Sequence, residues 1–295
     1  MPQGTIDNVL VTQFSDMIHV KSQQIKARTR PYVQQKKMTG DVFAYDGLGT
    51  VEAAEVTGRV QPTQFSEIDH TRRKIARRRF TVTLPIDDMD VRGALLNPEG
   101  KYAEAVTRAV ERVFDKVVAE AAFADVLTGR EFGTTVTFAG DGGLTVDATA
   151  GLTYAKLLEG KQNYIDNDVG TDLNEEFVLL ATGDEHTALM QQTNLISGDF
   201  SRQFVVDKGM ITRAVGIDLV YFAANATNPI LGVSGGTRSN ILMSSRGICV
   251  GISKDMSIKI SDRPDYVDTK QVQIVIILGA VRTEGALVQK VTTTD

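Results

Sequence analysis

The segment between Phe43 and Asp90 most constrains the fold, because it is rich in strand-forming residues but offers a core little to bury. A long amphipathic helical pattern follows it. Within the segment, TVEAAEVTGRVQPTQFS and KIARRRFTVTLPI predict two antiparallel strands joined by the polar connector EIDHTRRK. A lone two-stranded ribbon is marginally stable in water. We therefore expect a projecting arm that needs the surface of another subunit.

Composition places the chain among ordinary globular proteins. Its 295 residues, 42% of them hydrophobic, suggest about two domains with a real core. No apolar run approaches the ~20 residues of a membrane span, and the N-terminus lacks the regions of a secretory signal. We expect the protein to stay in the cytoplasm where it is made. The single cysteine, Cys249, lies in the apolar run GICVGIS, so we predict a buried, unpaired thiol.

Charge is distributed unevenly along the chain. Residues 1–86 hold 13 Lys and Arg against 8 Asp and Glu, whereas the remaining residues hold 19 against 29. A basic N-terminal part and an acidic body are complementary between neighbouring copies, which guides association more than it adds affinity. Nucleic acid is the competing partner for the basic part.

The helical pattern predicts a long spine from Asn97 to Ala124. Asn97 is a suitable N-cap, Pro98 suits the first helical position, and Gly129 is a plausible stop. Apolar residues recur at steps of three and four, as one buried helix face requires: Tyr102, Val106, Val110, Val113, Val117 and Ala121. Residues 1–40 before the arm read as an extended or partly helical segment held only by contacts with other parts.

The rest of the chain predicts a mixed α+β body. LTYAKLLEGKQNYIDN reads as a helix, EEFVLLAT as a buried strand, and DEHTALMQQ as a short helix begun by Asp184. Strands broken at Lys208, Gly209 and Gly216 follow, and then further strands around glycine turns. Two long alternating strands close the chain, with Ile258 and Ile260 opposite a second set: Val272, Ile274, Ile276 and Leu278.

Residue patterns typical of catalytic or metal sites are missing from the sequence. His19, His70 and His186 lie far apart without metal-type neighbours. Nucleotide-binding glycine loops and the GxSxG elbow do not occur. The acidic group Asp87, Asp88 and Asp90 suits a solvated turn or a partner for arginines better than a cation site. We expect no enzyme activity, cofactor or metal ion.

The segment RRKIARRR is the densest charged run. It concentrates six positive charges in eight residues, namely Arg72, Arg73, Lys74, Arg77, Arg78 and Arg79. As a nucleic-acid reader it would contact phosphates without reading sequence. It lacks interleaved aromatic residues for base stacking, and the whole chain is acidic. We therefore favour these six residues as inter-subunit contacts.

The order of these elements resembles the major capsid proteins of tailed bacteriophages, the Hong Kong ninety-seven-type fold. The more specific passages are FTVTLPIDDMDVRGALLNPEGKYAEAVTRAVERVFDKVVAEAAF, VDKGMITRAVGIDLVYFAANA and the closing strands. The resemblance implies a division into five parts. These are an N-terminal arm (1–40), an extended β-hairpin loop (41–90), a peripheral domain with the spine helix (91–143), an axial domain (144–254) and the return strands of the peripheral domain (255–295).

The resemblance also implies a function and partners. Copies of such a chain form hexamers and pentamers that tile an icosahedral phage head around double-stranded DNA, which they contact non-specifically. Because only about forty residues precede the loop, a separate scaffolding protein is expected, with a portal and possible decoration proteins. Such a chain is part of the virion and assembles in the cytoplasm of the host bacterium.

Three alternatives stay open at this point. The chain is compatible with a nucleic-acid-binding protein that uses its basic arm. A bacterial nanocompartment shell would share the fold. An enzyme with a site in the glycine-rich middle region is the third, although no constellation of residues supports it.

Overall fold

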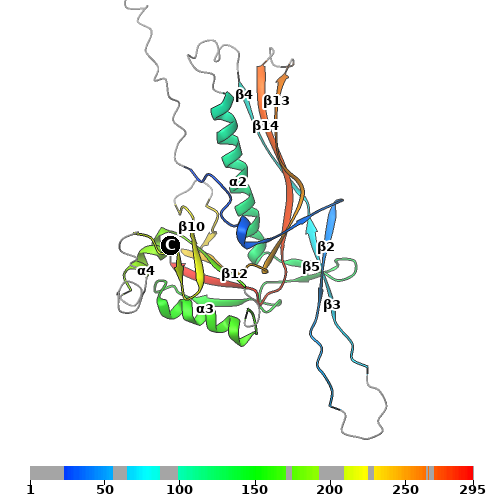
Figure 1. The fold of residues 1–295 in the computed structure, drawn as a ribbon, viewed down its shortest axis with the longest axis vertical. Helices are drawn as coiled ribbons and strands as arrows, with labels where there is room; N and C mark the ends of the chain where they lie inside the picture. The colour runs from blue at the N-terminus through cyan, green and yellow to red at the C-terminus, as the bar shows by residue number, and fades with distance from the viewer. Residues whose placement is uncertain are drawn as a thin grey trace, which may run out of the picture. The chain divides into compact units, whose positions relative to one another are not determined.

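The computed structural model describes residues 23–55, 65–86, 99–170, 175–192, 209–224, 229–263, 265 and 269–294. The chain divides into two compact units. The first takes the described residues within Met1–Lys26, Arg79–Arg112 and Lys254–Ile276. The second takes those within Ala27–Arg78, Val113–Ser253 and Ile277–Asp295. The architecture is α+β, as predicted (Figure 1). The five-part division proposed from the resemblance stays a prediction.

The long helix α2 covers Glu99–Phe123, so the predicted spine is present. Asn97 and Pro98 lie outside the described residues. Four of the predicted face residues are buried, namely Val106, Val110, Val117 and Ala121, whereas Tyr102 is 37% exposed. Gly129 as the stop is wrong, because the chain leaves the helix after Phe123 to form strand β5 (Val126–Thr128). Gly129 instead turns the chain after β5, with φ of 92°.

The predicted hairpin exists, but its strands lie elsewhere in the sequence. Strand β2 (Val42–Leu48) pairs antiparallel with β3 (His70–Ala76), and the two leave the other strands of the second unit as a narrow ribbon (Figure 1). Residues 51–55, expected to be extended, form no strand, and 56–64 lie outside the described residues. EIDHTRRK is therefore not a connector, because its last five residues, from His70 to Lys74, form the start of β3. KIARRRFTVTLPI is divided at Arg77 between β3 and β4 (Arg78–Ile86).

Packing at the hairpin root, the end of the hairpin around Phe43, Tyr45 and Ile75, explains why these residues form the paired strands. Ile75 is fully buried in a small cluster with Met38, Val126, Cys249 and Val281. Phe43 and Tyr45 of β2 pack against the same cluster. A strand pairs firmly where one of its faces can be buried. Val51 and its neighbours have no such cluster, since residues 51–55 are exposed.

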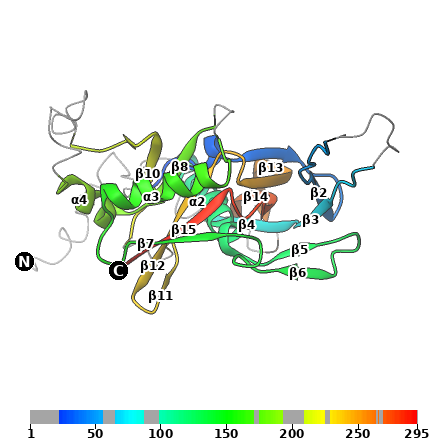
Figure 2. The ribbon, with the colours of Figure 1, turned by 90° about the horizontal axis from the view of Figure 1, so that it is seen from below.

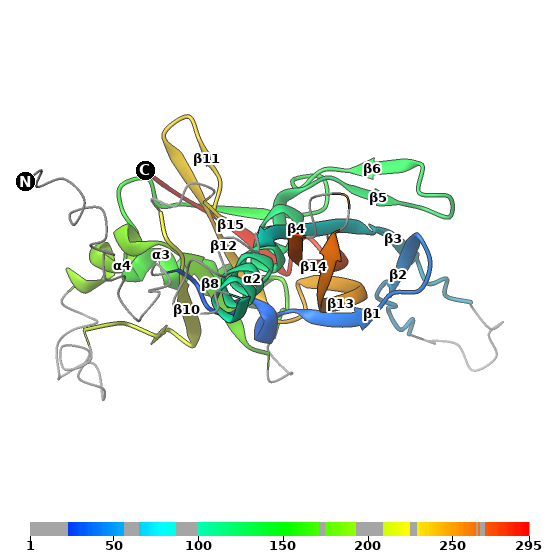
Figure 3. The same ribbon diagram turned by 90° about the horizontal axis from the view of Figure 1, so that it is seen from above.

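The second unit is built on a seven-stranded sheet with the order β7-β15-β12-β8-β10-β9, in which β11 pairs with β12. These strands are β7 (Leu144–Asp147), β8 (Phe177–Ala181), β9 (Arg213–Ala214), β10 (Ile217–Tyr221), β11 (Val233–Ser234), β12 (Thr237–Ser244) and β15 (Val288–Thr294). The β11–β12 turn projects from the sheet in Figures 2 and 3. The predicted buried strand EEFVLLAT is confirmed as β8, all of whose residues are buried.

Helix α3 (Tyr154–Asp166) confirms the prediction for LTYAKLLEGKQNYIDN. It packs on the sheet through Gly160 and the fully buried Tyr164, whose hydroxyl donates to Leu242 O at 2.9 Å. Helix α4 (Gly183–Met190) is also present, but Asp184 does not begin it. Thr182 is its N-cap, and Glu185 completes a reciprocal capping box.

The two long strands predicted near the C-terminus are β13 (Ile248–Arg263) and β14 (Thr269–Arg282). They are neighbours in a four-stranded sheet with the order β1-β13-β14-β4, in which β1 is Gln34–Lys37. The alternation predicted for β14 is confirmed by four residues at most 1% exposed: Val272, Ile274, Ile276 and Leu278. Ile258 and Ile260 of β13 are half exposed. Among the helices that the structure describes, none has the length and apolar character needed to span a membrane.

The segment before the hairpin is held by one carboxylate of the spine helix. Asp115 is fully buried and accepts hydrogen bonds from the backbone N–H groups of Arg28 and Thr29, both at 3.0 Å. The Thr29 hydroxyl donates to the same carboxylate at 2.6 Å. β1 then pairs in parallel with β13 in the register Gln34↔Cys249 to Lys37↔Ile252. The expectation that contacts with other parts hold this segment is confirmed for residues 28–37.

Candidate assembly interface

The hairpin is supported by the rest of the second unit only near its root. β2 and β3 pair from Val42↔Ala76 to Leu48↔His70, and Gly49 N–H extends the ladder to Asp69 O at 2.8 Å. On its other side, β3 pairs with β5 at a single position, Arg73↔Thr128. β5 in turn pairs antiparallel with β6 (Thr134–Val136), and the two strands lie side by side in Figures 2 and 3. Beyond the root, the described hairpin is therefore a two-stranded ribbon.

The six basic residues predicted as inter-subunit contacts occupy three kinds of place. Three are exposed and lie in ion pairs within the chain: Arg72 with Asp46, Arg77 with Asp41, and Arg78 with Glu120. Lys74 is partly buried, with its ammonium over the Phe132 ring at 5.9 Å, and Arg79 is exposed. Arg73 is only 7% exposed. Their role between subunits stays a prediction, and Arg73 has a defined role within its own chain.

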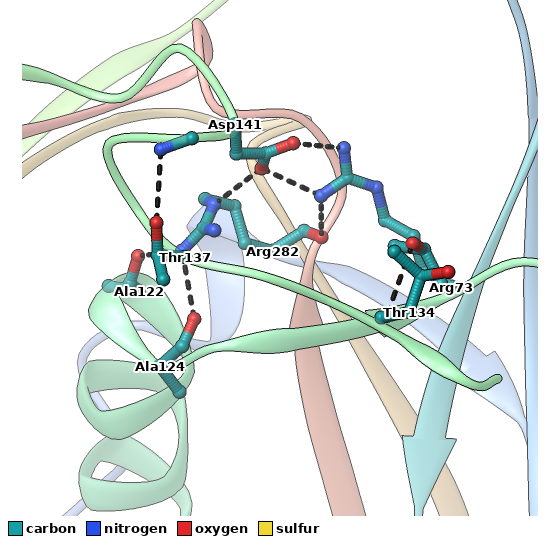
Figure 4. A network of polar contacts seen from close by, with 9 residues as sticks. Arg73, Ala122, Ala124, Thr134, Thr137, Asp141 and Arg282 are labelled. Carbon is teal, nitrogen blue, oxygen red and sulfur yellow. Dashed lines mark hydrogen bonds and ion pairs between the residues drawn. The ribbon is translucent and has the colours of Figure 1, made fainter.

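A buried polar network anchors β3 to the body of the second unit (Figure 4). Arg73 donates to both carboxylate oxygens of Asp141, at 2.6 and 2.7 Å. Arg282, at the end of β14, donates to Asp141 through Nε at 2.8 Å. Its Nη1 donates to the carbonyl oxygens of Ala122 and Ala124, at 2.9 and 3.1 Å, where helix α2 ends. The Asp141 carboxylate thus joins the hairpin strand β3 to strand β14. Through Arg282 it is also connected to the end of helix α2.

The electrostatics of Asp141 follow from this arrangement. The Asp141 side chain is 9% exposed and that of Arg282 is fully buried. Burial by itself raises the pKa of Asp141, but the hydrogen bonds from Arg73 and Arg282 outweigh it and hold the pKa below its ordinary value. The carboxylate is therefore ionised at neutral pH. In contrast, the lowered pKa of Asp46 comes from its exposed hydrogen bond with Arg72.

Two glycines permit the close approach of backbones around this network. A Cβ at Gly279 of β14 would lie 2.1 Å from Ala76 O, at the end of β3. A Cβ at Gly285 would lie 2.0 Å from Asp141 O. Neither contact can be relieved by a side-chain rotation, because the atom met is backbone. Both positions therefore require glycine for the hairpin root and the Asp141 loop to take their observed places.

The described tip of the hairpin carries exposed apolar side chains beside four exposed acidic ones. We define the tip as residues 48–55 and 65–69. Leu48 is 71% exposed, Phe65 is 93% exposed, and Val51 and Ile68 are 48% and 44% exposed. These exposed apolar side chains make the described tip a candidate interaction surface.

The other sites considered from the sequence have different outcomes. Within the described ranges, no group of three His, Cys, Asp or Glu side chains is placed to hold a metal ion. Asp87, Asp88, Asp90 and His19 lie outside the described residues. Cys249 is confirmed as a buried free thiol, and burial raises its pKa to about 11.

Sequence motifs identify neither Asp141 nor Arg282, although Arg282 carries a signal. Arg282 lies in phase with the buried face of β14, an even number of positions after Leu278. A charged residue in a buried register predicts a buried partner of opposite charge. Asp141 carries no such mark, because an acidic residue in a glycine-rich loop is usually solvated. Only the fold identifies it as the partner.

Comparison with known proteins gives one family. The family model described as "Phage capsid protein" matches residues 6–295. The comparison with curated proteins finds no match.

Solved structures of phage heads are similar to this chain over almost its whole length. The head structure of Helicobacter pylori bacteriophage KHP40 aligns with a TM-score of 0.74 at 10% identity, covering 99% of this chain and 99% of that one. The capsid asymmetric unit of cyanophage Pam1 gives 0.73 at 16% identity, covering 96% of each chain. The capsid of cyanophage P-SCSP1u gives 0.73 at 12% identity, covering 98% of this chain and 94% of that one. At these identities the likeness is one of fold.

Proposed function

Since the chain belongs to the phage capsid protein family and is a major capsid protein, we propose that its hairpin holds neighbouring subunits together in the hexamers and pentamers of an icosahedral head. One observation carries this proposal. The described hairpin leaves its body as a two-stranded ribbon and carries exposed apolar side chains beyond its paired strands, with Phe65 93% exposed. Two strands alone are marginally stable in water. A neighbouring copy would supply the surface that the ribbon lacks.

Assembly explains how modest contacts suffice. Each subunit of a shell touches several neighbours at once, so every further contact forms within an already connected assembly and at high effective concentration. The anchored root directs the ribbon, because Asp141 and its two arginines hold β3 on the body. The stability of the hairpin then belongs to the shell rather than to the subunit.

A hairpin deletion tests the proposal directly. Residues 49–69 are replaced by an Asn-Gly turn, which suits a two-residue hairpin connection. We expect a folded subunit that forms no closed shells, observed by negative-stain electron microscopy and sedimentation. The matched control is Ile165→Ser, which removes a 55% exposed apolar side chain from α3. Closed shells of normal size from the deletion variant would overturn the proposal.

The basic residues beside the root allow a second test. Replacing Arg77, Arg78 and Arg79 by glutamine removes three exposed charges from the root. Exposed ion pairs add little to the stability of a folded chain. We expect normal thermal unfolding of the subunit but impaired assembly. Arg130→Gln, in the exposed β5–β6 turn, is the control. Normal shells from the triple variant would count against an ionic role between subunits.

The further partners follow from the role of a capsid protein. The protein is part of the virion. We infer that it assembles in the cytoplasm of a bacterial host with a separate scaffolding protein and a portal, and that decoration proteins are possible partners. The packaged double-stranded DNA is contacted without sequence specificity, and the chain has no catalytic role. Co-expression with neighbouring phage genes, followed by imaging of the particles, tests these partners. The family match favours a phage head over a nanocompartment shell.

A further inference from the structure

We propose that Thr293 and Asn240 of the folded subunit join through an ester bond within the chain, with Glu185 as the base. The inference concerns a buried cluster in the second unit, outside the hairpin, and does not depend on the proposed function. Glu185 belongs to α4, Asn240 to β12 and Thr293 to β15. The bond prevents two neighbouring strands of the seven-stranded sheet from separating.

The three side chains are in contact and shielded from water. The Thr293 hydroxyl donates to Glu185 Oε1 at 2.6 Å, and Asn240 Nδ2 donates to the same oxygen at 2.9 Å. Asn240 Nδ2 also donates to Thr293 Oγ1 at 2.9 Å. Asn240 is fully buried, and the other two residues are 3% exposed. One carboxylate oxygen therefore contacts both the hydroxyl that attacks and the amide nitrogen that leaves.

Backbone pairing and a helix cap produce this geometry. Strands β12 and β15 are antiparallel, with Arg238 directly opposite Thr293. Asn240, two positions after Arg238, is therefore the diagonal neighbour of Thr293 on the same face of the sheet. The Glu185 side chain is held by its capping box, in which Oε2 accepts from Thr182 N–H at 2.8 Å. Each reacting group is thus positioned by a regular element of the fold.

The charges of the cluster suit proton abstraction from the hydroxyl. Burial by itself raises the pKa of Glu185, but hydrogen bonds from Thr182, Thr293 and Asn240 outweigh it and hold the pKa below its ordinary value. The carboxylate is therefore ionised at neutral pH and can accept a proton. An adjacent base is what activates a hydroxyl as a nucleophile. Arg238, buried on the same face, adds positive charge where the Asn240 carbonyl oxygen becomes negative during the attack.

The Asn240 amide also contains an unsatisfied atom. Its nitrogen faces two oxygen acceptors, which fixes the orientation of the amide. Its Oδ1 is buried and has no hydrogen-bond partner among the residues that the structure describes. A buried amide oxygen in this position costs free energy. An ester carbonyl is a weaker hydrogen-bond acceptor than an amide carbonyl, so forming the ester reduces that cost.

The reaction balances without another reactant. The Asn240 amide turns about its Cβ–Cγ bond, a soft torsion, and presents its carbonyl carbon to Thr293 Oγ1. Glu185 takes the hydroxyl proton while an electron pair of Oγ1 forms the bond to Cγ. The Cγ–Nδ2 bond then breaks, Glu185 returns the proton to the nitrogen, and ammonia leaves. Proximity within the fold promotes this step, and exclusion of water protects the ester. Glu185 acts once, on its own chain, and converts no external substrate.

Mass spectrometry of the purified full chain tests the proposal. We expect a mass below that of the sequence by one ammonia molecule. Trypsin cleaves after Arg238, Arg246 and Lys290, so residues 239–246 and 291–295 should be released as one joined pair. Fragmentation of this pair should locate the bond between Asn240 and Thr293. An undiminished mass after prolonged incubation of the folded chain, as subunit and as assembled particle, would overturn the proposal.

Variants assign the individual roles. Thr293→Val removes the attacking hydroxyl at nearly constant size, and Glu185→Gln removes the base. Both should retain the ammonia and release the two peptides separately. Thr292→Val is the matched control, because successive side chains of a strand point to opposite faces, and it should still form the joined pair.

The remaining outcomes are also decisive. Loss of ammonia without a joined pair would indicate cyclisation at Asn240 itself and would contradict the proposal. A joined pair in folded Glu185→Gln would contradict the role of Glu185 as the base. Thermal unfolding verifies that each variant is folded. If Glu185→Gln does not fold, the wild-type mass and the comparison of Thr293→Val with Thr292→Val still decide whether the ester exists.

Discussion

Substitution of Asp141 by asparagine is the sharpest test of how the hairpin is rooted. The change keeps the size of the side chain but removes the charge that joins Arg73 and Arg282. Arg282 is fully buried and Arg73 is 7% exposed, so both guanidinium groups would lose their anionic partner without gaining water. Removing one partner of a buried ion pair costs about 3–5 kcal/mol.

That cost predicts a large thermal shift. For a chain somewhat longer than 250 residues, each kcal/mol lowers Tm by about 2–4 °C, so Asp141→Asn should lower Tm by roughly 10 °C. The assay is thermal unfolding of unassembled subunit, with sedimentation to verify that state. The matched control is Asp46→Asn, which breaks an exposed pair with Arg72 and should leave Tm nearly unchanged.

The same residue sets a dependence on pH. The folded-state pKa of Asp141 is lowered by its hydrogen bonds with Arg73 and Arg282. Its contribution to stability is therefore present above the unfolded pKa of about 3.9 and is lost as pH falls through the lower folded value. Asp141→Asn should lack this part of the acid sensitivity. Equal shifts for Asp141→Asn and Asp46→Asn, or an unchanged acid profile, would refute the reasoning.

Three further predictions concern the body of the subunit. Gly279→Ala should displace the root of the hairpin, because its Cβ would meet Ala76 O at 2.1 Å, and should speed amide exchange in β3; unchanged exchange would contradict the close packing. Asp115→Ala should speed amide exchange at Thr29 at least tenfold, since each buried donor left without an acceptor costs about 1–3 kcal/mol; protection equal to that of the wild type would show that the N-terminal segment is held otherwise. The Cys249 thiol, buried and with its pKa raised to about 11, should react with a thiol reagent at pH 8 only after unfolding in urea, and rapid labelling of the native subunit would show that this region opens.

Local patterns predicted most of the elements and missed some of their ends. The 3.6-residue period located α2 and α3, and the apolar run located β8. The sequence also predicts the hairpin, but it places the two strands at the wrong residues. Strand propensity in the segment 50–66 is as good as in β2, so propensity alone cannot choose between them. The choice depends on Phe43 and Tyr45, which pack on a cluster drawn from distant parts of the chain.

The basic segment shows the same limit. Six positive charges in eight residues are evident from the sequence, but their individual roles are not. Arg73 lies two positions before the buried Ile75 on strand β3, so the two side chains are on the same face of the strand and both are buried. Arg72, one position away, lies on the exposed face and pairs with Asp46.

The class of the protein follows from its sequence: an arm of strands, a long spine helix, an α+β body and no catalytic motif. Those properties depend on residues within a few positions of one another, because caps, helical periods and strand alternation act locally. How the arm is anchored follows only from the packing of distant parts of the chain. Asp141 meets Arg73 across 68 positions and Arg282 across 141, and no local pattern extends that far. A buried charge finds its partner only after the chain has folded around it, since burial is what makes the pairing necessary.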